Sequence, residues 1–144
     1  MANNVRVDVI GDMEHLPRHT REAVQYAIDR TRHNDGLQLN FALNYGSRHE
    51  IVSAMKTMLA DIKEEKLSID ELDEEHFSKY LNTAGLTDPD LLIRTGGEKR
   101  LSNFLLWQLA YTEFWFTDVL WPDFSEKDFL LAIDDYRQRQ RRFG

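Results

Sequence analysis

Segments typical of strands and segments typical of helices alternate about three times along this chain, and this order is the feature that most constrains its fold. The strand-like segments are short and rich in β-branched, leucine or aromatic residues. They are residues 5–9, 37–43, 91–93 and 114–116. Strands that alternate with helices are the sequence pattern of a layered α/β domain. We therefore predict an α/β fold with a mostly parallel sheet flanked by helices.

Helices are predicted to begin at Pro17, Ser47, Glu74 and Ser125. The second of these starts has Ser47 followed three residues later by Glu50, which is the pattern of a capping box. The last helix carries four apolar or aromatic residues at helical spacing, which we expect to face inward. These four are Phe129, Leu130, Ile133 and Tyr136.

The second strand does not match the expected pattern of a buried parallel strand. Residues 37–43 alternate between apolar and polar positions, whereas a parallel strand covered on both faces is continuously apolar. An edge strand would explain the alternation, and so would a strand that lines a cavity.

Composition excludes several classes of protein. The chain has 144 residues, a net charge of −7 and no cysteine, so one domain spanning residues 1–144 is expected and disulfide scaffolds, thiol catalysis and iron–sulfur clusters are excluded. The first residues lack the apolar core of a signal peptide, and a cytoplasmic location is expected. The net acidity argues against general nucleic-acid binding.

Four arginines, at positions 137, 139, 141 and 142, make the end of the chain basic. They could complement the dipole of the last helix, bind an anionic partner or belong to an anion site. Composition alone leaves the three alternatives open.

The segment 91–104 has the composition of an anion site. It runs from an apolar strand into a loop with two glycines, whose N–H groups could turn toward an anion. Arg94 and Arg100 can each bind phosphate oxygens with two N–H donors, and Ser102 adds a hydroxyl at the start of a predicted short helix or turn. These donors suggest a diphosphate pocket. An ordinary glycine turn with solvated arginines has the same composition, and both interpretations remain open.

Glu113 directly precedes the aromatic strand 114–116. A carboxylate at such a place requires a partner. Either Mg²⁺ bridges Glu113 to a bound phosphate, or Glu113 forms a salt bridge with Arg94 or Arg100.

Four segments together resemble the cis-prenyltransferase family, in particular the C-terminal signature of the undecaprenyl diphosphate synthases. The main one is residues 93–108, Ile-Arg-Thr-Gly-Gly-Glu-Lys-Arg-Leu-Ser-Asn-Phe-Leu-Leu-Trp-Gln, which continues through Tyr111 and Glu113. The others follow the family's order, and they are residues 44–48, 120–124 and 141–144. The resemblance covers essentially the whole chain.

The resemblance implies an enzyme that condenses isopentenyl diphosphate with an allylic diphosphate such as farnesyl diphosphate. Each round adds a cis double bond, requires Mg²⁺ and builds the lipid carrier for cell-wall glycans. The family resemblance further implies a cytoplasmic homodimer that contacts the membrane through its product and binds no nucleic acid.

The resemblance also assigns roles to individual residues. Glu113 would help to bind Mg²⁺, and Leu37 and Leu39 would line a tunnel for the growing chain. Five residues would contact substrate, the last two in the neighbouring subunit's site. They are Arg94, Arg100, Ser102, Arg142 and Gly144.

The sequence departs from the family pattern in two places. Ser47 stands where many members have a second glycine, and the N-terminal segment Asp-Gly-Asn-Gly-Arg-Trp-Ala, with the family's catalytic Asp and the Asn that follows it, does not occur in this chain. We therefore expect the C-terminal part of the enzyme, inactive alone and prone to self-associate. The alternative is a non-catalytic partner subunit of a heteromeric prenyltransferase.

Overall fold

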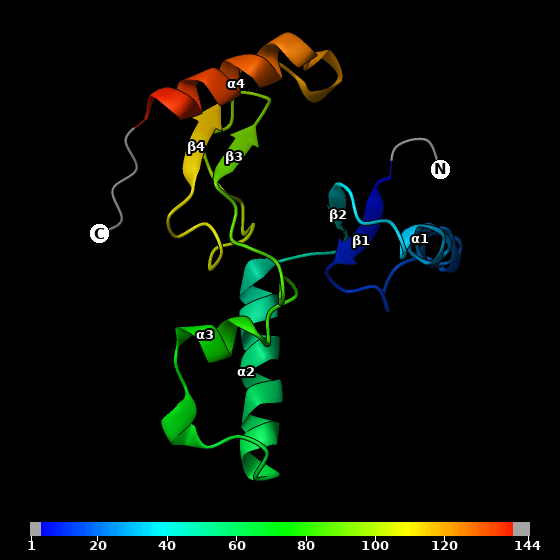
Figure 1. Cartoon of the computed structure of the whole chain (residues 1–144), viewed down its shortest axis with the longest axis vertical. Coiled ribbons are helices and arrows are strands. Elements are labelled where there is room, and N and C mark those ends of the chain that lie inside the picture. Colours follow the sequence, from blue (N-terminus) through cyan, green and yellow to red (C-terminus); the bar gives the residue numbers. More distant parts are fainter. Residues whose placement is uncertain (1–3, 140–144) are drawn as a thin grey trace. The chain divides into compact units, whose positions relative to one another are not determined.

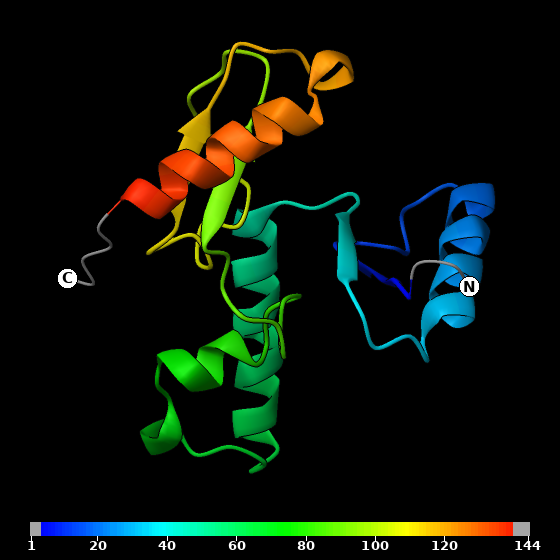
Figure 2. The ribbon, with the colours of Figure 1, turned by 45° about the horizontal axis from the view of Figure 1, so that its top comes forward.

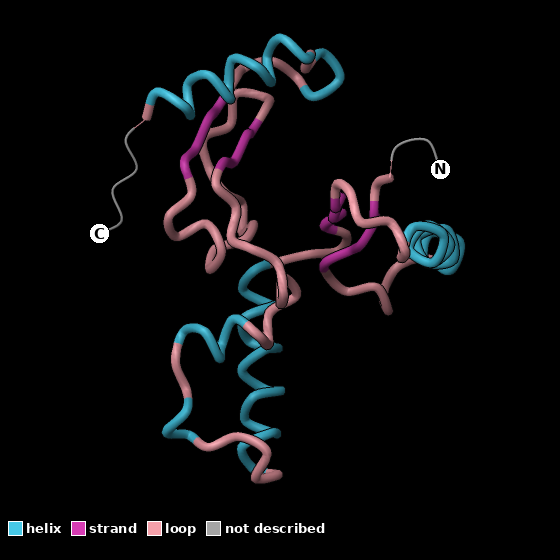
Figure 3. The backbone as a smooth tube through the Cα atoms, in the orientation of Figure 1, coloured by secondary structure: helices cyan, strands magenta, loops and turns pink. Residues whose placement is uncertain are grey.

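The computed structural model describes residues 4–139. Contacts between Cα atoms divide the chain into two compact units, residues 1–85 and residues 86–144, which we call the N-terminal unit and the C-terminal unit. Each unit contains one pair of parallel strands (Figures 1 and 3). Every strand pairing among the described residues is parallel, so the predicted α/β class with parallel strands flanked by helices is confirmed.

The N-terminal unit opens with a strand–helix–strand arrangement. Strand β1 (Arg6–Ile10) is followed by helix α1 (Arg18–Thr31) and strand β2 (Gln38–Ala42). The strands pair in register from Arg6 opposite Gln38 to Ile10 opposite Ala42, and α1 packs against β1. All three elements lie where the sequence pattern predicts them.

Helix α2 (Ser47–Lys63), a short 3₁₀ helix η1 (Ile69–Glu71) and helix α3 (Glu74–Ser78) complete this unit. The predicted capping box of α2 is wrong, because Gly46 is the N-cap residue and has no side chain to supply a capping bond. Glu50 instead is 3% exposed and accepts hydrogen bonds from the Tyr45 hydroxyl and, at 2.7 Å, from the Asn82 backbone N–H. Its carboxylate thus joins α2 to a segment more than thirty residues away in sequence.

Strand β2 has β1 as its only partner strand in the described part of the chain. Leu39 and Phe41, which lie on β2, are 41% and 47% exposed. Strand β2 is thus an edge of the described strand pair, but its apolar side chains are exposed and the polar Gln38 and Asn40 are half-buried, so an edge position does not by itself account for the alternating pattern.

The C-terminal unit contains strand β3 (Leu91–Arg94), strand β4 (Glu113–Phe116), the 3₁₀ helix η2 (Trp121–Asp123) and helix α4 (Glu126–Gln138). Helix α4 lies along the β3–β4 pair and contacts β4 (Figure 2). Residues 102–111 form bends and turns and no helix. The buried apolar residues of this unit are Leu105, Leu109 and Ala132.

The inward face predicted for α4 is only partly correct. Ile133 and Tyr136 are half-buried, but Phe129 and Leu130 are 47% and 52% exposed. Ala132, which has no exposed surface, is the residue of α4 that the structure buries.

Ser125 begins α4 as predicted, and it forms a capping box with Asp128 that the sequence analysis did not single out; this leads to a testable prediction. The Ser125 backbone N–H and hydroxyl donate to Asp128 Oδ2 at 2.8 and 2.6 Å, and these bonds hold the pKa of Asp128 below its usual value. We expect Ser125→Ala to destabilise α4 by about 1 kcal/mol, measured by hydrogen exchange of residues 126–129 at neutral pH.

The sign of the pH dependence follows from the lowered pKa. A carboxylate with a depressed folded-state pKa contributes stability above its unfolded-state pKa, and the contribution disappears as the pH falls through the folded-state value. The variant should therefore differ from the parent chain at neutral pH and converge toward it in acid. An equal difference at all pH values would contradict this role of the Ser125–Asp128 pair.

Among the described residues, no helix combines the length and the apolar character that crossing a bilayer requires.

Candidate functional site

The turn that follows β3 is held by the segment that follows β4. The Gly96 N–H donates to the Val119 carbonyl at 2.8 Å and the Gly97 N–H donates to the Thr117 carbonyl at 2.9 Å. Both glycines have positive φ, of 83° and 75°, which glycine adopts without strain. Both N–H groups are thus already bonded to carbonyls of the segment that follows β4. The prediction that they turn toward an anion is therefore wrong.

Of the predicted anion site, the Arg94 guanidinium and the Ser102 hydroxyl come together, whereas Arg100 joins them only through its backbone carbonyl. Arg94, the last residue of β3, donates through Nη1 to the Arg100 carbonyl and, at 3.2 Å, to Ser102 Oγ. The guanidinium of Arg94 therefore closes the loop 95–101 by linking its two ends through hydrogen bonds. This loop lies at the carboxyl end of a parallel strand, where α/β proteins ordinarily bind ligands.

The side chain of Arg100 has a different partner. Its Nη1 lies 2.5 Å from Glu98 Oε2, and the two side chains are 65% and 48% exposed. An exposed ion pair contributes little to stability because water competes for both charges. Arg100 is thus held weakly and faces solvent, whereas Arg94 is held by two oxygens of its own loop.

Ser102 contacts Arg94 from a strained backbone. Ser102 and Asn103 have φ values of 50° and 64°, in the left-handed region that side chains other than glycine rarely adopt. Such strain gathers at functional sites, where the surrounding structure maintains it. Ser102 does not begin a helix, so the expected contribution of a helix dipole is absent from this site.

Glu113 does not join this cluster. In the β3–β4 register Glu113 lies opposite Leu91, and Arg94 lies opposite Phe116. Since side chains alternate between faces and each residue advances about 3.3 Å, Glu113 and Arg94 lie on opposite faces and about 10 Å apart along the pair. The predicted salt bridge to Arg94 or Arg100 is therefore wrong.

The partner of Glu113 is Arg139, next to the last turn of α4. Arg139 Nη1 donates to Glu113 Oε2 at 2.8 Å and to the Phe114 carbonyl at 2.9 Å, and Nη2 lies 2.5 Å from Asp135 Oδ2. Glu113 and Asp135 together raise the pKa of Arg139 above its usual value. Sequence reasoning missed this pair, although the spacing of Asp135 and Arg139 by four residues is a signal of a helical ion pair.

The remaining predicted site residues lie elsewhere. Leu37 immediately precedes β2 and is 68% exposed, and Leu39 is on β2. Arg142 and Gly144 lie outside the described residues.

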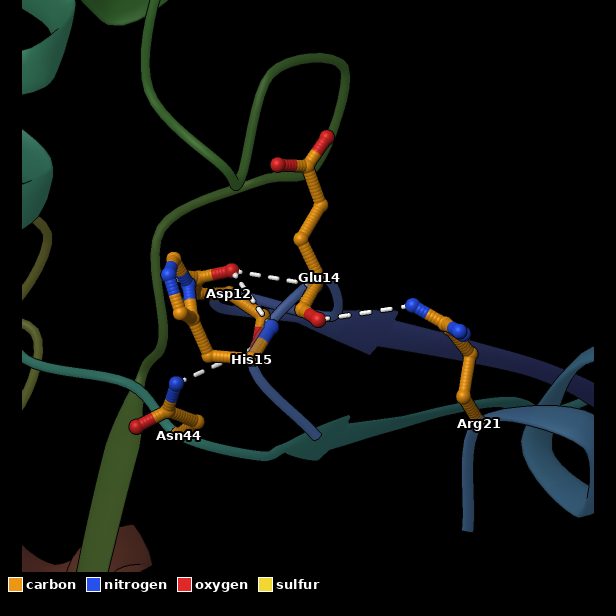
Figure 4. A network of polar contacts seen from close by, with 5 residues as sticks. All are labelled: Asp12, Glu14, His15, Arg21 and Asn44. Atoms are coloured by element: carbon orange, nitrogen blue, oxygen red, sulfur yellow. Dashed lines mark hydrogen bonds and ion pairs between the residues drawn. The ribbon is translucent and has the colours of Figure 1, made fainter. Parts of the chain in front are cut away.

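The N-terminal unit contains a polar pocket that the sequence did not indicate. It has a volume of about 300 Å³ and lies where β1 and β2 end, beside α2. Asp12 accepts N–H bonds from Glu14 and His15 at 3.0 and 3.4 Å, and its backbone carbonyl accepts a bond from Asn44 at 3.2 Å (Figure 4). The hydrogen bond to the His15 ring, at 2.5 Å, lowers the pKa of Asp12.

The charge of this pocket decides which ligands it suits. Its lining includes Asp12, Glu14 and Glu50 but no Lys or Arg. Carboxylates repel phosphate groups, so this pocket is a poor diphosphate site. The Arg94 cluster is the better candidate.

Known proteins resemble this chain along its whole length. The isoprenyl transferases of Oceanobacillus iheyensis and Bacillus subtilis are 60% and 59% identical to it over all 144 residues. The chain spans 57% and 55% of these two relatives, which is little more than half of their length.

Solved structures of two diphosphate synthases also resemble this chain. The lavandulyl diphosphate synthase of Lavandula x intermedia, solved with dimethylallyl diphosphate, is 41% identical with a TM-score of 0.95, over 99% of this chain and 61% of the other. A probable undecaprenyl diphosphate synthase from Campylobacter jejuni is 40% identical with a TM-score of 0.83, over 98% of this chain and 64% of the other.

The family described as putative undecaprenyl diphosphate synthase matches residues 1–144, which include the loop closed by Arg94. With relatives of about 60% identity along the whole chain, this match agrees with the resemblance inferred from residues 93–108. The chain belongs to the prenyltransferase family of the undecaprenyl diphosphate synthases.

Proposed function

We propose that this chain is the part of a cis-prenyltransferase that binds isopentenyl diphosphate. The complete enzyme would condense isopentenyl diphosphate with an allylic diphosphate such as farnesyl diphosphate and make the lipid carrier for cell-wall glycans. The observation that carries the proposal is the Arg94 loop, in which the Arg94 guanidinium bonds the Ser102 hydroxyl and the Arg100 backbone carbonyl at the carboxyl end of β3.

The chemistry of this loop suits a diphosphate. Arg94, Lys99 and Arg100 oppose the single carboxylate of Glu98, so the loop is net positive. A guanidinium binds phosphate oxygens through two parallel N–H groups, and Arg100 is exposed with a weak partner. Arg94 and the strained Ser102 would hold the loop in shape, so that little ordering is needed when the anion binds.

The roles of the other predicted residues remain proposals. Leu37 and Leu39 offer apolar surface to a growing isoprenoid chain. Arg142 and Gly144 would act in the site of a neighbouring copy of the enzyme, so we propose a homodimer. A cytoplasmic location and membrane contact through the product belong to the same proposal.

Mg²⁺ is proposed as a requirement of the complete enzyme, where it would neutralise diphosphate charge. Among residues 4–139, no three His, Asp or Glu side chains gather as a metal site. Glu113 is bonded to Arg139 and lies at the far end of the strand pair from Arg94. It does not fit as a ligand of a metal at this chain's own Arg94 cluster, and we assign it no step there.

The experiment compares two proteins. One is this chain, and the other is the Oceanobacillus iheyensis relative with its matching segment replaced by this chain. With farnesyl diphosphate, radiolabelled isopentenyl diphosphate and Mg²⁺, we expect elongation by the hybrid and none by the chain alone, because the chain spans only part of its relatives.

The controls separate the alternatives. The unmodified relative must elongate under the same conditions. An inactive but folded hybrid would contradict the proposal and favour a non-catalytic partner subunit. Elongation by the chain alone would contradict the prediction that it is inactive.

A further inference from the structure

The ion pair between Glu98 and Arg100 engages one of the two arginines of the proposed anion site. Glu98 Oε2 lies 2.5 Å from Arg100 Nη1, and no other partner of the Arg100 side chain is recorded among the described residues. An anion that binds Arg100 through the same N–H groups must displace this carboxylate. The two ligands therefore compete.

The Arg94 side chain is bonded to neutral oxygens rather than to a carboxylate, so an anion that binds it displaces no charged group. Its Nη1 donates to the Arg100 carbonyl and to Ser102 Oγ, which are neutral oxygens of its own loop. Neutral acceptors leave the full positive charge of Arg94 available to a ligand, whereas Glu98 cancels that of Arg100. The Glu98 carboxylate thus competes with an anion for Arg100 and not for Arg94.

The backbone keeps Glu98 close to Arg100. Gly97 is bonded through its N–H to Thr117, with a φ of 75°, and Glu98 follows it directly. A side chain that starts from a fixed turn has a high local concentration at a partner two residues away. Both side chains are exposed, so the carboxylate can move into water when an anion arrives.

We propose that Glu98 is an internal competitor of the diphosphate for Arg100, and that it lowers the affinity of the site for anions. The inference rests on the proposed function, since it assumes that Arg100 contacts the diphosphate. A site weakened in this way releases a diphosphate-bearing product more readily, because Glu98 restores the partner of Arg100 as the anion leaves.

The test measures binding of inorganic pyrophosphate to this chain without added metal, followed by NMR of the backbone amides of residues 94–103. We expect Glu98→Gln to lower the dissociation constant about threefold, because an exposed ion pair of this kind contributes up to about a factor of five. Both partners are exposed, so we expect the substitution to leave the fold intact.

Asp118→Asn is the matched control. Asp118 borders the same turn, since its Oδ1 would lie 3.1 Å from a Cβ at Gly97, and the variant removes the same negative charge. Competition at Arg100 predicts a larger gain in affinity for Glu98→Gln than for Asp118→Asn. Equal gains, or no gain for Glu98→Gln, would overturn the inference.

Arg100→Ala distinguishes failure of this inference from failure of the proposed function. If this variant binds pyrophosphate as tightly as the parent chain, Arg100 is not in the anion site and both proposals are wrong. If it binds more weakly while Glu98→Gln and Asp118→Asn behave alike, the anion site stands and the role of Glu98 is wrong.

Discussion

Arg100→Ala is expected to reduce kcat/KM for isopentenyl diphosphate by roughly 30- to 1000-fold in the hybrid enzyme described above. This range corresponds to about 2–4 kcal/mol, the scale of a lost charge-assisted contact to a desolvated anion. Arg100 is exposed and only weakly paired, so its removal takes a ligand contact away without disturbing the core. The measurement is steady-state elongation at varied isopentenyl diphosphate.

Lys99→Ala is the control for Arg100. Lys99 is the neighbouring cation in the same exposed loop, and it is outside the set of residues to which we assign substrate contact. A long-range effect of charge would affect both variants equally, whereas a direct contact affects Arg100→Ala far more. Similar losses for the two variants would remove Arg100 from the site.

Gly11→Ala is expected to destabilise the N-terminal unit by about 3 kcal/mol. Gly11 follows β1 with a φ of 116°, and a Cβ there would overlap the Leu43 carbonyl oxygen, far inside van der Waals contact. The cost combines backbone strain with overpacking against an atom that cannot move away. Urea denaturation followed by far-ultraviolet circular dichroism measures it.

Gly85→Ala separates the two parts of that cost. Gly85 also has a positive φ, of 81°, but a Cβ there meets nothing within 4 Å. We expect this variant to lose about 1 kcal/mol, the cost of the left-handed backbone alone. If the two variants lost equal stability, the predicted overlap at Gly11 would be incorrect.

The positions of strands and helices were predictable because they depend on local patterns. All four strands and the starts of α3 and α4 lie at or within a residue of their predicted positions. Each follows from alternation, helical spacing or a cap within a few residues. The capping box at Ser47 failed because Glu50 found partners in Tyr45 and Asn82, and the latter contact joins distant parts of the chain.

In the candidate site, too, some features were predictable from the sequence and others depended on tertiary packing. The grouping of Arg94 with Ser102 was predictable, since both belong to one loop of the motif. The hydrogen bonds from the Gly96 and Gly97 N–H groups to the Val119 and Thr117 carbonyls were not predictable. They depend on how the segment after β4 runs beside that loop. The exposure of Phe129 and Leu130 likewise depends on which face of α4 meets the sheet.

The sequence by itself determined the family, the parallel α/β class and the loop that carries Arg94, Arg100 and Ser102, because each of these depends on patterns of residues that are contiguous in the chain. The tertiary structure alone decided the partner of Glu113. The sequence did not show which cations share the face of the sheet on which that carboxylate lies, and only the register of β3 with β4 and the position of α4 selected Arg139 over Arg94. Charge is a property of a residue, but the choice of its counter-ion depends on distance, and distance is determined by the packing of elements that lie far apart in sequence.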